Sequence, residues 1–158
     1  MTHEQAQAIV QKYVNAWNQV SGRPSMWVLC ASPGQTLAIP GVTFGASEQL
    51  CAGMELPLNA HLIVLHSAMT PESTLRTFLH EYGHAIYRID HSQHFDPIDS
   101  EVAAIRHSLL ALDNEGLTSL AREEVTAIIS MGSFEPYASA IQRLTMDDLW
   151  RTYSEGRV

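Results

Sequence analysis

Two histidines and a glutamate in one short segment have the types and spacing needed to bind and use a metal ion. His80, Glu81 and His84 follow the pattern HExxH, and the residues on both sides have the apolar spacing of a helix. On an α-helix, residues i and i+4 lie on one face, so both imidazoles can reach the same point. Neutral imidazole is a good zinc ligand, and a neighbouring carboxylate can accept a proton from water at the metal. The segment therefore indicates a zinc hydrolase that binds one Zn²⁺ per chain.

The helical periodicity places these polar residues together and away from the apolar ones. With His80 at zero, His84 falls near ~40° and Glu81 near ~100° on a helical wheel. The opposite side, between ~160° and ~260°, is apolar and carries Leu75, Phe78, Leu79, Tyr82, Ile86 and Ile89. Gly83 lowers helix stability by about 1 kcal/mol relative to alanine. It is therefore either a tolerated glycine or the point where another element packs closely.

A hydrolytic zinc needs a third protein ligand and a position for water, and Glu101 is the better candidate for that ligand. Glu101 lies 17 residues after His84, in the first turns of the next expected helix. A short connection between the two helices can fold it back onto the first. It also lies at the edge of the apolar stripe of its own helix, about 40° from Ile105.

Three other residues are alternatives for the third ligand. Asp90 occupies the last ligand position of the metzincin pattern, but Tyr87 replaces the glycine that turns the chain, and a continuing helix points Asp90 away. His91 is on the correct face but about 10 Å beyond His84 along the axis, so it could ligate only if the helix ended early. His94 is further along the chain, although DNA-repair-type zincins use a histidine third ligand.

The elements that must position these residues follow from periodicity and capping. Thr70-Pro71 and Asp96-Pro97 each predict a helix start, and Thr145 with Asp148 resembles a capping box. The expected helices are 4–19, 71–89, 96–114, 117–132, 137–144 and 146–153, and the expected strands are 27–30, 36–39, 42–44 and 61–66. This pattern predicts an α+β domain with an N-terminal helix, a short sheet of 3–4 strands, the HExxH helix, the glutamate helix and C-terminal helices.

Composition favours one globular domain over residues 1–158, because 46% of the residues are apolar and only 16% are charged. Seventeen acids against nine bases give a net charge of −8, and Lys12 is the only lysine. We therefore expect no direct binding to nucleic acid.

The start of the chain has no signal-peptide pattern and the apolar runs are strand-sized, which predicts a cytoplasmic protein without a membrane span. Cys30 and Cys51 are expected to be free thiols.

The strand at 62–65, the proline-started helix with HEYGHAIY and the second helix opening SEVAAIRHS resemble a minimal gluzincin. The segment from Ala60 to Leu112 is similar to the ImmA-type peptidases of mobile elements and the related ArdC-type domain. The resemblance implies a small zincin-like zinc metallopeptidase in which His80, His84 and Glu101 hold zinc. Glu81 would then be the general base, taking a proton from zinc-bound water and returning it to the leaving amine. The implied partner is a peptide or protein substrate.

The sequence leaves the supporting residues and the oligomeric state open. The oxyanion of the reaction needs a stabiliser besides zinc, and five residues are alternatives for that role: His91, His94, His107, Tyr87 and Tyr137. Acids at 90, 96 and 99 could orient the metal histidines, although roles in turns and caps fit them better. His61 and His66 are expected to be packing or surface residues.

Two other functions compete with a peptidase. The chain could be a specialised or inactive zincin-fold module that regulates or binds other proteins of a mobile element, although the presence of Glu81 counts against this. It could also be a non-peptidase hydrolase, or a toxin or effector, that uses the same site.

Overall fold

The computed structural model describes residues 1–31, 41–44, 60–66, 69–91 and 93–156, and helices predominate among them. Their contacts divide the chain into two compact units, Met1–Glu81 and Tyr82–Val158. The boundary falls inside the continuous helix α2 (Pro71–Asp90), and the expectation of a single domain stays a prediction. None of the helices in these ranges is long and apolar enough to cross a membrane.

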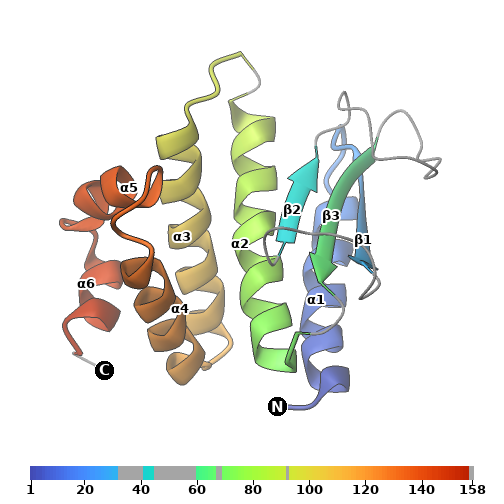
Figure 1. Cartoon of the computed structure of the whole chain (residues 1–158). Coiled ribbons are helices and arrows are strands. Elements are labelled where there is room, and N and C mark those ends of the chain that lie inside the picture. Colours follow the sequence, from blue (N-terminus) through green and yellow to red (C-terminus); the bar gives the residue numbers. More distant parts are fainter. Residues whose placement is uncertain (32–40, 45–59, 67–68, 92, 157–158) are drawn as a thin grey trace. The chain divides into compact units, whose positions relative to one another are not determined.

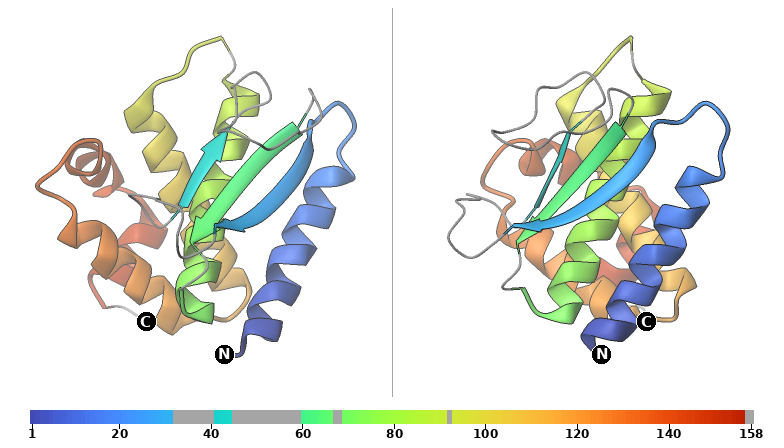
Figure 2. Two further views of the ribbon diagram at one scale, coloured as in Figure 1. Left: turned by 45° about the vertical axis from the view of Figure 1, so that its right-hand side comes forward. Right: turned by 90° about the vertical axis from the view of Figure 1, so that its right-hand side faces the viewer.

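The first unit combines helix α1 (His3–Asn18) with a small sheet of β1 (Ser25–Ala31), β2 (Gly41–Phe44) and β3 (Ala60–His66). Among the described strands β3 is central, pairing with β1 in parallel and with β2 in antiparallel orientation (Figures 1 and 2). Leu62 and Ile63 point to opposite faces of β3, yet both are buried. A strand covered on both faces explains the uninterrupted apolar run in the sequence.

One aromatic side chain of helix α1 packs on the sheet. Trp17 is fully buried, and its indole Nε1 donates a hydrogen bond to the carbonyl oxygen of Pro24 at 2.6 Å. The ring of Trp17 also contacts the ring of His61 on β3, with 5.6 Å between centroids. His61 is therefore a packing residue, as the sequence predicted. The side chain of His66 lies outside the described residues.

Helix α2 begins as its sequence predicts and then runs without a break past Gly83. The hydroxyl of Thr70 accepts a hydrogen bond from the backbone N–H of Ser73 at 3.2 Å, and Pro71 opens the first turn. The helix ends at Asp90, one residue later than expected. It therefore carries the complete HExxH segment in regular helical geometry.

The second unit packs α3 (Pro97–Asn114) against α4 (Thr118–Ser130), α5 (Tyr137–Leu144) and α6 (Asp148–Ser154) (Figure 1). The Asp96 carboxylate starts α3 by accepting hydrogen bonds from the backbone N–H groups of Ile98 and Asp99 at 2.8 and 3.0 Å. Ile105, Leu109 and Leu112 form the fully buried apolar face of α3. A second buried face carries small and polar side chains, namely Ser100, Glu101, Ala104 and Ser108.

These elements are those of the α+β class predicted from the sequence, but one cap was predicted wrongly. The expected capping box of Thr145 and Asp148 does not form, because the side chain of Asp147 accepts the hydrogen bond from the N–H of Trp150 at 2.9 Å. Arg106 on α3 holds that carboxylate, with 2.7 Å between Nε and Oδ2. The expected strand at 36–39, Cys51 and the side chain of Cys30 lie outside the described residues.

Gly83 lies at a close approach between α2 and α3. A Cβ at this position would lie 2.7 Å from the Cα of Ala104 and 3.1 Å from both the Ala104 carbonyl oxygen and the His107 Cβ. Real Cβ atoms essentially never lie within 3.0 Å of a non-bonded heavy atom, and a backbone Cα cannot rotate away as a side chain can. Of the two sequence interpretations of Gly83, the structure therefore supports close packing.

We predict that Gly83→Ala lowers the free energy of unfolding by about 1–2 kcal/mol, because overpacking at the helix contact outweighs the gain in helix propensity. Urea denaturation of the metal-free protein measures this difference. Propensity alone predicts the opposite sign, a gain of about 1 kcal/mol. A variant more stable than the parent chain would therefore show that the helices do not meet at Gly83.

Candidate metal centre

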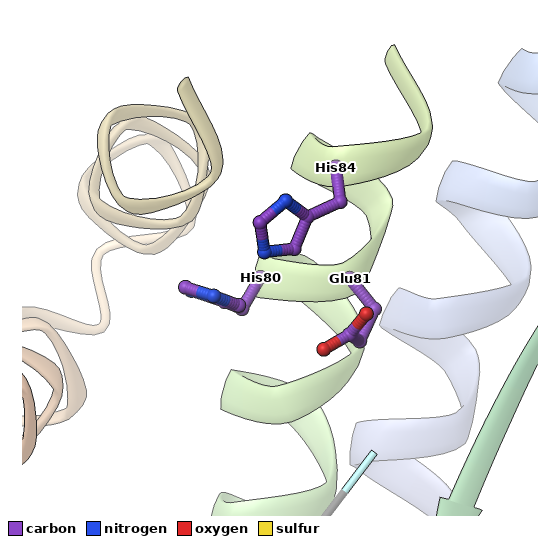
Figure 3. Close-up of side chains that lie close together, drawn as sticks. All are labelled: His80, Glu81 and His84. Atoms are coloured by element: carbon purple, nitrogen blue, oxygen red, sulfur yellow. The ribbon is translucent and has the colours of Figure 1, made fainter. Parts of the chain in front are cut away.

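His80, Glu81 and His84 form a close group on α2. One ligand atom from each residue lies within 4.8 Å of the others. Figure 3 shows the two imidazole rings leaving the same side of the helix, one turn apart, with the Glu81 carboxylate beside them. The His80 side chain is nearly buried, whereas Glu81 and His84 are partly exposed. The HExxH spacing thus brings together three of the four site residues that the sequence predicted.

Glu101 on α3 contacts the second histidine of this group. Its Oε2 lies 3.1 Å from Nε2 of His84, and its side chain is only 7% exposed. A carboxylate this deeply buried needs a positively charged partner. Two ligands of a tetrahedral zinc, each about 2.0–2.1 Å from the metal, lie about 3.3 Å apart. The observed separation is therefore close to the spacing of two zinc ligands.

The other ring nitrogen of His84 meets a residue that the sequence interpretation missed. Nδ1 of His84 lies 2.7 Å from the hydroxyl oxygen of Ser100, which is itself buried. The sequence had offered acids for this orienting role, not a serine. A usable signal was present, because Ser100, Ala104 and Ser108 repeat at i, i+4 and i+8. Small residues at that spacing mark a helix face that packs closely on a neighbour.

The structure does not bring the alternative third ligands to the HExxH segment. Helix α2 continues through Asp90, which is exposed. His91 stacks on Tyr87 at 4.1 Å between ring centroids, and its Nδ1 lies 3.1 Å from the Tyr87 carbonyl oxygen. His94 is also exposed. Within the described ranges, the group able to hold a metal consists of His80, Glu81 and His84. Glu101 is not part of that group, although its Oε2 contacts Nε2 of His84.

Two of the residues considered for oxyanion stabilisation have packing roles instead. The Tyr87 hydroxyl accepts a hydrogen bond from the backbone N–H of Asp96 at 3.1 Å, which ties the end of α2 to the start of α3. His107 stacks on Tyr82 with 5.2 Å between ring centroids. Burial lowers the pKa of His107 to about 4. Its imidazole is therefore neutral at pH 7 and adds no positive charge beside Gly83.

The residues present fit a zinc ion chemically. Two imidazoles and one carboxylate make a donor set that catalytic zinc sites use, with a fourth position left for water. Imidazole nitrogens favour zinc over magnesium or calcium, which prefer oxygen ligands. A divalent cation held by His84 and Glu101 would also offset the charge of the buried Glu101 carboxylate.

Comparisons of the chain with models of protein families, with curated proteins and with solved structures gave no match. The chemistry assigned to the site accordingly rests on its residues and their geometry.

Proposed function

We propose that the chain is a cytoplasmic zinc metallopeptidase of the gluzincin type, with a small zincin-like domain whose short sheet has 3–4 strands. One observation carries this proposal, namely the gathering of His80, Glu81 and His84 on one face of α2. The contact of Glu101 with His84 at 3.1 Å supports it, because it adds a buried carboxylate from a second helix.

In this proposal His80, His84 and Glu101 bind the metal and Glu81 does not. Zinc bound there supplies a Lewis acid that makes water more acidic and polarises the scissile carbonyl. The Glu81 carboxylate accepts a proton from the attacking water and then delivers it to the nitrogen of the leaving amine. A structural zinc would need no such base beside it, so the presence of Glu81 favours an enzyme over a regulatory module.

The net charge of the chain agrees with a cation-binding role. The chain carries a formal charge of −8, and a negative protein field raises the local concentration of cations. The same field disfavours strongly acidic substrates. We therefore expect neutral or basic peptide segments to be cleaved in preference to acidic ones.

The proposal predicts one zinc ion per chain, which chelators remove. His80→Ala, His84→Ala and Glu101→Ala should each weaken zinc binding, because two remaining ligands hold zinc poorly. The loss should exceed the about 10–100-fold that is typical when a residue that only hydrogen-bonds to a metal ligand is removed. Competition with a chromophoric chelator measures the affinities, and metal analysis gives the stoichiometry.

Asp90→Ala and His91→Ala are the matched controls, since they remove the alternative ligands from the same part of the chain. Both should bind zinc like the parent protein. If one of them loses zinc while Glu101→Ala keeps it, the third ligand comes from the end of α2 and the gluzincin assignment is wrong.

Glu81→Gln should keep zinc and fold but lower peptide cleavage by about 100-fold or more, since general-base catalysis contributes that much. The amide has nearly the shape of the carboxylate, so the change isolates the proton transfer. Mass spectrometry of a peptide library incubated with each zinc-loaded protein measures cleavage. Equal cleavage by the variant would disprove the general-base role, and no cleavage by the parent protein would favour a binding module.

A further inference from the structure

Both nitrogens of the His84 ring lie against neighbouring residues of α3. Nε2 is 3.1 Å from Oε2 of Glu101, and Nδ1 is 2.7 Å from Oγ of Ser100. All three residues belong to the second unit. The ring therefore has a defined orientation, with one nitrogen towards the carboxylate and the other towards the hydroxyl.

A metal ligand must present an unprotonated nitrogen, and the hydrogen bond made by the other nitrogen sets which one is free. We propose that Ser100 is a positioning residue that accepts a hydrogen bond from Nδ1–H of His84, so that Nε2 is the nitrogen presented to the metal. This inference rests on the proposed function, in which His84 is a zinc ligand.

The surroundings of Ser100 suit this role. Ser100 is 1% exposed, so its hydroxyl is shielded from bulk water. Its backbone N–H donates to the carbonyl oxygen of Asp96 at 2.9 Å, which anchors Ser100 in the first turn of α3. A hydroxyl orients the imidazole without adding charge, whereas a third acid here would stand beside Glu101 and repel it.

Ser108 provides a control on the same helix face. It lies two turns after Ser100, its side chain is fully buried, and its hydroxyl has no hydrogen-bond partner in the described structure. Ser108→Ala therefore removes the same atoms from an equally buried position, away from His84. Ser100→Thr is the conservative variant, since it keeps the hydroxyl.

The test is zinc affinity, measured by chelator competition on the full chain, for the parent protein and for Ser100→Ala, Ser100→Thr and Ser108→Ala. We expect Ser100→Ala to bind zinc about 10–100-fold more weakly, as is typical when an orienting partner is lost. Ser100→Thr should recover much of that loss, and Ser108→Ala should bind like the parent protein. Circular dichroism and urea denaturation confirm that the variants fold.

NMR of the zinc-loaded parent protein supplies a measurement that needs no variant. We expect the His84 ring to ligate through Nε2 and to carry its proton on Nδ1. Ligation through Nδ1 would overturn the role of Ser100, even if Ser100→Ala proved unable to fold.

Three affinity results would also contradict the proposal. Unchanged zinc affinity in Ser100→Ala would remove the role of Ser100 while leaving the metal site intact. An equal loss in Ser108→Ala would mean that both variants merely loosen the helix contact. Failure of the parent protein to bind zinc would instead defeat the proposed function, and the role of Ser100 would fall with it.

Discussion

The close approach of α2 and α3 at Gly83 and Ala104 is the contact that places His84 beside Ser100 and Glu101. A side chain at position 83 would meet the Cα of Ala104 at 2.7 Å, so only glycine allows the two backbones to come this near. Their proximity brings a short serine hydroxyl within 2.7 Å of His84. A helix pair held further apart by larger side chains would leave both His84 and Glu101 without these partners.

The burial of Glu101 has an electrostatic consequence. An ionised carboxylate that is 7% exposed loses most of its hydration and needs compensating positive charge. In this structure, Nε2 of His84 lies 3.1 Å from that carboxylate. A zinc ion bound by Glu101 would supply positive charge. If zinc binds there as proposed, it is therefore expected to stabilise this part of the fold.

Most local features of the fold and site could be predicted from sequence, whereas most features set by distant contacts could not. The starts of α2 and α3 follow from Thr70-Pro71 and Asp96-Pro97, because capping depends on neighbouring residues. The common face of His80 and His84 follows from helical periodicity alone. The strand order β1-β3-β2 depends on pairing between remote segments, and the contact of Ser100 depends on how closely two helices pack. A helical wheel gives direction but not that distance.

The most direct test of the metal site is a crystal structure of the chain with zinc bound. We predict a single zinc ion coordinated by His80, His84 and Glu101, with Glu81 nearby but not ligating and with one position open to water. Coordination by Asp90, His91 or His94 in place of Glu101, or zinc bound away from the HExxH segment, would contradict the account.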